Sequence, residues 1–186
     1  DLMGGGSSGG QLNHCVLTEN SAASMGGGSS SGTLNNCLLT GNTAAGGAAA
    51  SECTLNNCTV QAGTDQPGSG VIYASLNNCI VYGYIGNNYE DSTFTYSCTT
   101  PDPGGTGNIT NDPQFVDAAA GNFHLQAASP CIEAGDNSAA PGATDLAGNP
   151  RIVFSRVDLG AYEFPAQPWY VATNGSDAAD GTSWAN

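Results

Sequence analysis

A four-residue motif recurs along the first half of the chain and sets its pattern of apolar and polar positions. The sequence Leu-Asn-Asn-Cys begins at residues 34, 55 and 76, and a variant with His in third place begins at residue 12. The cysteines that close these copies stand at nearly equal intervals, at positions 15, 37, 58 and 79. A repeat of this length indicates one supersecondary unit per period, stacked on its neighbours.

Two further copies of the motif are degenerate. Residues 96–98 (YSC) match its end after a slightly shortened period, and residues 131–136 (CIEAGD) match residues 37–42 (CLLTGN). The longer interval between Cys98 and Cys131 leaves space for an inserted loop. We therefore place six cysteines at one register of the repeat.

The apolar residues between the motifs do not recur with helical spacing. Each period holds one recurrent Leu, several β-branched residues and runs of small residues such as residues 46–51 (GGAAAS). Short strands separated by tight turns fit this composition, whereas a leucine-rich repeat needs a recurrent spine of leucines. The sequence therefore predicts an all-β fold, a right-handed parallel β-helix with coils of about 21 residues.

Equivalent residues of successive coils in such a solenoid stack about 4.8 Å apart. We expect the Leu to point inward, the Asn pair to make a bend, and the Cys to begin the next strand in the core. The predicted core ladder consists of Leu12, Leu34, Leu55, Leu76, Cys15, Cys37, Cys58, Cys79, Cys98 and Cys131, and the predicted turn ladder consists of Asn13, Asn35, Asn56 and Asn77.

The second half of the chain carries a different set of motifs. They are residues 108–117 (NITNDPQFVD), 123–125 (FHL), 129–136 (SPCIEAGD), 145–152 (DLAGNPRI) and 157–164 (VDLGAYEF). Together with the repeat, they resemble the secreted bacterial right-handed β-helix proteins of the pectate-lyase-like superfamily, most closely those with a choice-of-anchor region. The resemblance covers about residues 10–164. It implies the fold and an extracellular or cell-surface location, and it implies no particular activity.

The last residues resemble the opening of such a domain, its first strand and cap. We therefore expect regular coils over residues 1–107, terminal coils and loops over 108–164, a linker over 165–168 and a cap segment over 169–186. The chain begins at Asp1 within what looks like a coil. We therefore expect the chain to be a mature product, an excised fragment or one unit of a longer repeat polypeptide.

Charge excludes several classes of partner. The chain has 16 acidic residues against two basic ones and a formal net charge of -14. It cannot present the basic surface that nucleic acids or anionic membranes require, and no apolar run is long enough to insert into a bilayer. Twelve of the acids follow residue 89, so the charge belongs mainly to the second half.

The sequence contains no clear catalytic set. Polysaccharide hydrolases need clustered carboxylates, yet Glu19, Glu52 and Asp65 are the only acids in residues 2–89. Lyases of the superfamily that the chain resembles use a Lys or Arg base beside calcium-binding acids. Arg151 and Arg156 lie instead in the terminal motifs, among acids with which they are expected to pair. We therefore predict no enzymatic activity and no catalytic residues.

The acids with which these arginines are expected to pair are Asp145, Asp158 and Glu163. No cofactor is predicted, although calcium is left open, because Asp145, Asp177 and Asp180 offer oxygen ligands. Neither an EF-hand nor a calcium-binding solenoid repeat is present, so solvated acidic loops are the plainer interpretation.

The seven cysteines allow two interpretations. They are either free core thiols or partly oxidised, because ladder neighbours lie within the Cα distance of a disulfide. Cys98 and Cys131 are the first pair expected to be oxidised, since their coils bracket the long loop. An odd number leaves at least one thiol without a partner in the chain.

A solenoid exposes backbone edges at its ends and needs caps. We therefore expect copies to assemble head to tail, with the cap segment of one copy completing the solenoid of the next through Trp169, Tyr170, Val171 and Trp184. The predicted function is a structural one, in an extracellular filament, sheath or adhesive fibre. The alternative is a secreted polysaccharide-degrading or carbohydrate-binding β-helix protein, with cell-surface polysaccharide as the partner.

Overall fold

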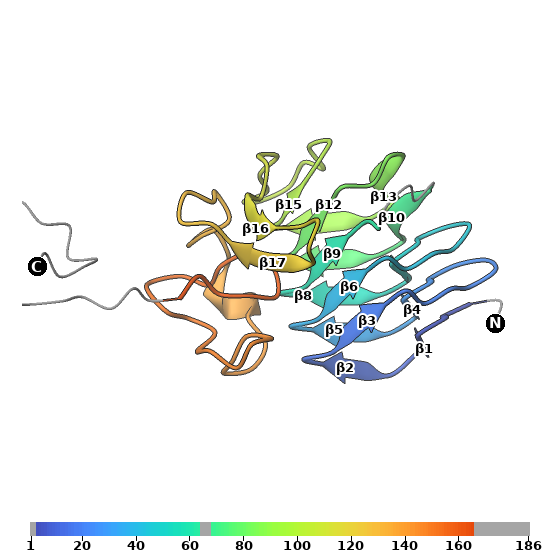
Figure 1. Cartoon of the computed structure of the whole chain (residues 1–186), viewed down its shortest axis with the longest axis horizontal. Coiled ribbons are helices and arrows are strands. Elements are labelled where there is room, and N and C mark those ends of the chain that lie inside the picture. The colour runs from blue at the N-terminus through green and yellow to red at the C-terminus, as the bar shows by residue number, and fades with distance from the viewer. Residues whose placement is uncertain (1–2, 64–67, 166–186) are drawn as a thin grey trace, which may run out of the picture.

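Three parallel sheets wind around a common axis in the computed structural model, which describes residues 3–63 and 68–165 (Figure 1). Each sheet has five strands, and each coil contributes one strand to every sheet. Strand partners through the first four coils are one sequence period apart, as in Leu12 with Leu34 and Leu34 with Leu55. The predicted fold class, an all-β parallel solenoid, is confirmed.

The strands are short, as expected for tight coils. Sheet 1 contains β1 (Ser7–Ser8), β4 (Ser29–Ser30), β7 (Ala50–Ser51), β10 (Ser69–Ile72) and β13 (Asn87–Glu90). Sheet 2 contains β2 (Gln11–Asn13), β5 (Thr33–Asn35), β8 (Thr54–Asn56), β11 (Ser75–Asn77) and β14 (Thr93–Thr95). Sheet 3 contains β3 (Val16–Thr18), β6 (Leu38–Thr40), β9 (Thr59–Gln61), β12 (Ile80–Tyr82) and β15 (Cys98–Thr99). An antiparallel hairpin of β16 (Phe115–Asp117) and β17 (Asn122–Leu125) and a 3-10 turn, η1 (Asn137–Ala139), follow.

The Leu and Asn ladders form as predicted. Leu34, Leu55 and Leu76 are at most 1% exposed, and the row continues into Phe94 of the fifth coil. Along the Asn ladder, each Nδ2 donates to the Oδ1 of the preceding coil. These bonds run from Asn35 to Asn13 (2.9 Å), from Asn56 to Asn35 (2.9 Å) and from Asn77 to Asn56 (3.0 Å).

The bend itself lies one residue after the Asn ladder, in the corner between sheets 2 and 3. The second Asn of each motif has a left-handed backbone there, with φ of 51° at Asn36, 48° at Asn57 and 54° at Asn78. Asn tolerates this conformation better than most residues with a side chain. His14 and Tyr96 occupy the same position in the first and fifth coils, with φ of 53° and 45°.

The recurrent Cys has a hydrogen-bonding role at this corner. The Sγ of Cys58 donates to the carbonyl of Asn56 (3.3 Å) and accepts the backbone N–H of Cys37 (3.4 Å). Ser97 makes the equivalent pair of bonds in the fifth coil, to Thr95 (2.9 Å) and from Cys79 (3.0 Å). A small side chain that both donates and accepts therefore satisfies backbone groups that the bend leaves in the core.

The prediction that six cysteines share this register is wrong for two of them. Cys98 pairs with Ile80 in sheet 3, so Ser97 takes the ladder position. The fifth coil is shorter than the fourth, because Leu76 pairs with Phe94, and this shortening displaces Cys98 by one position. Cys131 lies outside the coils, in a second apolar cluster with Ile80 and Cys98.

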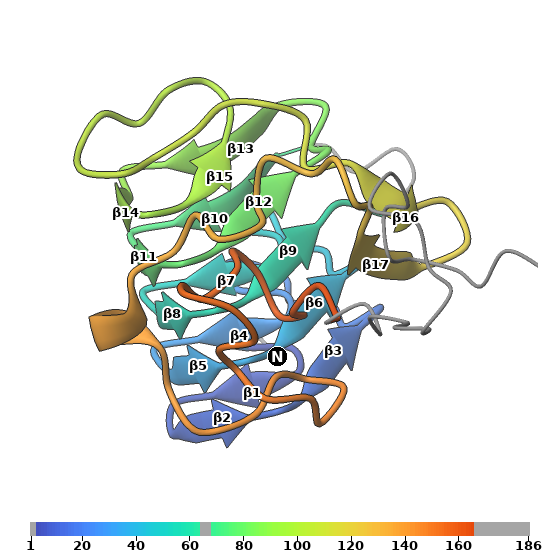
Figure 2. The same ribbon diagram turned by 90° about the vertical axis from the view of Figure 1, so that its left-hand side faces the viewer.

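Beyond an isolated bridge between Cys98 and Ile109, the described chain adds no further coil, in contrast to the terminal coils expected over residues 108–164. Residues 131–164, which we call the strap, run along the outside of the solenoid instead. Figure 2 shows this orange-to-red trace passing beside the strands of sheets 2 and 3 from the last coils to the first and back. Gly160 permits the close approach, since a Cβ there would lie 2.7 Å from the Thr59 hydroxyl.

Candidate functional site

The first coil forms one end of the solenoid. β1, β2 and β3 are the outermost strands of their sheets, and each pairs only with a strand of the second coil (Figure 1). Their other edges face no strand of the described chain. Backbone N–H and C=O groups along such an edge are the groups to which another strand can add.

Side chains of the first coil are correspondingly uncovered. Leu12 and Cys15 are partly exposed, whereas Leu34 and Cys37, their counterparts in the second coil, are 0% exposed. The apolar core is therefore open to solvent at this end.

The Asn ladder also ends at the first coil. Asn13 Oδ1 accepts from Asn35 within the ladder and from the Gln11 side chain (3.3 Å). Its Nδ2 has no acceptor among the described residues. Asn35, Asn56 and Asn77 each donate to the Asn of the preceding coil. The Asn13 side chain therefore leaves an amide donor without a described partner at the open end of the ladder.

The opposite end of the solenoid is covered. The loop of residues 100–112 folds over the fifth coil, where Thr106 O accepts from Tyr96 N (2.8 Å) and Ile109 O accepts from Thr99 N (3.1 Å). Asn108 closes the corner, accepting from Ser97 N and donating to Phe94 O, both at 2.9 Å. The two ends therefore differ, and the molecule has a direction.

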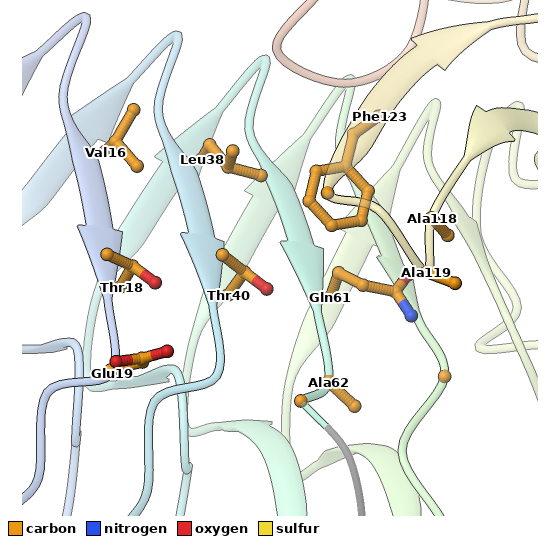
Figure 3. Close-up of a pocket in the computed structure, with 13 residues that line it drawn as sticks. Val16, Thr18, Glu19, Leu38, Thr40, Gln61, Ala62, Ala118, Ala119 and Phe123 are labelled. Atoms are coloured by element: carbon orange, nitrogen blue, oxygen red, sulfur yellow. The ribbon is translucent and has the colours of Figure 1, made fainter.

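A groove of about 570 Å³ lies on the outer face of sheet 3, between its first three strands and the β16–β17 hairpin. Figure 3 shows Thr18, Thr40 and Gln61 side by side on neighbouring strands, with Phe123 and the hairpin residue Ala119 across from them. The neutral polar row borders the apolar side chains of Val16, Leu38 and Phe123.

The groove contains few groups suited to catalysis. Glu19 is the one carboxylate in its lining, and Asp112 is the one in the lining of an adjacent cavity of about 390 Å³. Gln61 borders both cavities, and its Oε1 is buried without a hydrogen-bond partner in the described chain. Within residues 3–63 and 68–165, no group of three or more His, Cys, Asp or Glu side chains is arranged to hold a metal ion.

The strap contacts the bend residue of every coil. Asn78 Nδ2 donates to Asp136 O (2.9 Å), Asn57 to Asp158 O (3.2 Å) and Asn36 to Pro141 O (2.8 Å). At the two ends, His14 Nε2 lies 3.0 Å from Thr144 O, and the Arg156 guanidinium lies 5.5 Å from the Tyr96 ring centroid. Sequence reasoning missed this contact, although the second Asn of the motif recurs almost as faithfully as the first.

Arg151 and Glu163 form a buried ion pair inside the strap, both at most 2% exposed. The Nε of Arg151 donates to Glu163 Oε1 (2.9 Å), and its Nη1 donates to Asn36 Oδ1 (3.1 Å), which ties the pair to the second coil. Burial raises the pKa of Glu163 to about 7, although Arg151 opposes the shift. The expected pairing is found for Arg151, whereas Arg156 contacts Tyr96 and donates to Gly135 O (2.9 Å).

Asp145, the calcium candidate inside the described chain, is 0% exposed. One of its oxygens accepts from Asn149 N (2.7 Å), and the other accepts from Asn149 Nδ2 (3.2 Å) and Glu163 N (2.9 Å). Both oxygens thus have protein donors. The other predicted residues, Asp177, Asp180, Trp169, Tyr170, Val171 and Trp184, lie outside the described residues.

No protein-family model and no curated protein matches the chain. In the part of the chain that the structure describes, no helix has the length and apolar character needed to cross a membrane. The candidate sites are therefore defined by their geometry: the open first coil and the groove on sheet 3.

Proposed function

We propose that the chain is a structural subunit of an extracellular or cell-surface assembly in which β-solenoids stack head to tail. The observation that carries this proposal is the uncovered first coil, with its three unpaired strand edges and its partly exposed Leu12 and Cys15. Another parallel coil would fit against this uncovered first coil, because it would extend all three sheets and cover the end of the core.

The covering coil is the cap segment, residues 169–186, of a second copy. Its sequence resembles the first strand and cap of secreted β-helix domains, which is the element that precedes a first coil. Contact between two different surfaces of identical subunits is heterologous, and it grows into a filament when the rotation does not close. Five stacked strands span about 24 Å, so each subunit would add at least about that length.

Cys15 provides a direct test, because it is the one partly exposed cysteine of the seven. Docking of a second copy would bury its thiol. We expect its alkylation by a maleimide to slow as protein concentration rises, while electron microscopy shows filaments. A chain ending at residue 168 should label at one rate at all concentrations and form none.

Varying the ionic strength distinguishes the proposed assembly, which needs residues 169–186, from nonspecific association. Subunits of net charge -14 repel one another, and added salt screens this repulsion. Protection of Cys15 should therefore increase with ionic strength in the full chain only. Concentration-independent labelling together with an absence of filaments at high salt would refute the proposal.

A second candidate function is carbohydrate binding in the groove on sheet 3. It is favoured by the row of Thr18, Thr40 and Gln61 beside the Phe123 ring, a mixture of neutral hydrogen-bonding groups and apolar surface. Calorimetric titration of the full chain with neutral and acidic oligosaccharides tests it. Binding that is lost in Thr40→Val but kept in the exposed control Thr93→Val would support this function.

A further inference from the structure

The strap is held to the solenoid at a second apolar cluster on the outer face of sheet 3. Ile80 and Cys98 contribute to it from the coils, Leu125 from the hairpin, and Cys131 and Leu159 from the strap. All five are at most 4% exposed. The cluster thus brings one cysteine of the last coil and one cysteine of the strap into the same dry site.

The two thiols belong to the same buried cluster. Interaction with the Cys98 side chain, together with burial, raises the pKa of Cys131 well above its ordinary value. The Cys98 thiol also donates to Asn111 O (3.1 Å), whereas Cys131 Sγ has no backbone partner among the described residues. Joining the two sulfurs would therefore remove the bond from Cys98 to Asn111 O, but it would take no acceptor away from a described backbone amide.

The ladder cysteines differ in this respect. Ladder cysteines of neighbouring coils also lie close together, because Cys58 Sγ is 3.4 Å from Cys37 N, and the Cys58 side chain raises the pKa of Cys37. Yet Cys58 Sγ donates to Asn56 O and accepts from Cys37 N, and Cys79 Sγ donates to Asn77 O (3.2 Å) and accepts from Cys58 N (3.4 Å). Oxidation would remove the S–H donor and draw sulfur away from an amide in the core, leaving backbone groups unsatisfied.

We infer that Cys98 and Cys131 form a disulfide that fastens the strap to the last coil, while the five other cysteines remain thiols. The oxidant is a low-molecular-weight disulfide. One thiolate attacks it and forms a mixed disulfide, and the second thiolate then displaces the remaining small thiol. Two protein thiols and one small disulfide thus become one protein disulfide and two small thiols.

The exchange has to occur before the strap closes. Both cysteines are 0% exposed in the folded chain, so neither a thiolate nor the small disulfide has access afterwards. The bond closes the loop between positions 98 and 131 and limits the freedom of that loop in the unfolded chain. It would add a covalent constraint at the point where the strap leaves the solenoid.

Peptide mapping tests the pairing directly. The full chain is refolded with a mixture of reduced and oxidised glutathione, denatured, alkylated with iodoacetamide and digested with chymotrypsin, since two arginines and no lysine give trypsin few sites. We expect one cross-linked peptide joining Cys98 to Cys131, with the other five cysteines alkylated. Alkylation of both residues, or cross-links between ladder cysteines, would overturn the inference.

Thermal unfolding provides a second readout. Reductant should lower the unfolding midpoint of the oxidised chain by roughly 10 °C. Cys131→Ser should lose this dependence on reductant, whereas the ladder control Cys58→Ser should keep it. A wild-type midpoint that does not respond to reductant would contradict the proposed constraint, whether or not the variants fold.

Discussion

Replacing Arg151 with Met tests how the strap is held to the coils. The substitution keeps most of the side-chain volume and removes the charge that faces Glu163. It also removes the donor to Asn36 Oδ1 in the second coil and the donor to Ala161 O within the strap (3.4 Å), so the bond from Asn36 to Pro141 O is left to hold the strap to Asn36. Glu163 stays buried, and its remaining donor is the backbone N–H of Asp158 (3.0 Å).

Breaking a buried pair on one side leaves an uncompensated charge, which typically costs about 3–5 kcal/mol. Both partners of this pair are almost completely buried, so solvent screens the loss little. We therefore expect Arg151→Met to lower the free energy of unfolding by about 3–5 kcal/mol above the wild-type Glu163 pKa of about 7, where the wild-type carboxylate is ionised. Adding Glu163→Leu to this variant should restore part of the loss, because it removes the orphaned charge.

The loss should depend on pH. Burial raises the pKa of Glu163 to about 7, and Arg151 is the group that lowers it, so the pKa should be higher in the variant. A raised folded-state pKa contributes stability that is fully present below the unfolded value of about 4.3 and is lost as pH rises through the folded value. In Arg151→Met this loss continues to higher pH than in the wild type. Both proteins lose this stability equally below about pH 6, so the difference between them should widen only as pH rises through and above the wild-type pKa of about 7.

Urea unfolding followed by circular dichroism at several pH values measures this difference. Arg156→Met is the matched control, because Arg156 is exposed and stacks on Tyr96, a contact worth about 0.5–1 kcal/mol. A cost below about 1 kcal/mol for Arg151→Met, or a cost that does not change with pH, would refute this account of the strap.

Two further pairs of substitutions test the ladders. Leu55→Ala creates a cavity in a fully buried row and should lower the free energy of unfolding by about 2–5 kcal/mol, whereas Leu12→Ala at the open end should lower it clearly less in the monomer. Equal losses in urea unfolding would mean that the first coil is already covered. Cys79→Ser should be tolerated better than Cys79→Ala, because only the serine hydroxyl can accept the hydrogen bond from Cys58 N, as Ser97 accepts the one from Cys79 N. Calorimetric melting points in the reverse order would exclude this role for the thiol.

The repeat predicted the solenoid because its information is local. A Leu, two Asn and a Cys at fixed spacing specify an inward side chain, a bend and a polar group that satisfies the bend, as the stacked Leu34, Leu55 and Leu76 show. The predicted register was wrong where the coil length changes, at the shorter fifth coil. Cys98 was aligned by residue type, but Ser97 makes the same two hydrogen bonds, and backbone pairing decides between them.

The strap was not predictable in the same way. Its contacts join residues that are far apart in the sequence, such as Asn36 with Pro141 and Asn57 with Asp158, and nothing in the spacing of either segment encodes the other. The prediction of an ion pair for Arg151 was right because a buried arginine among acids needs a charge partner. The groove on sheet 3 was also missed, since it depends on where the β16–β17 hairpin packs.

The strap also explains how the first coil can keep its edges free. A terminal coil has neighbours on one side only and frays unless something else holds it. Here Thr144 contacts His14 at the corner of the first coil, while Arg151 and Pro141 hold the second coil through Asn36. These contacts come from the side of the solenoid, so they keep β1, β2 and β3 in register without using their outer edges. A coil held in this way is preorganised for pairing with another strand set, which would reduce the ordering cost of the proposed head-to-tail contact.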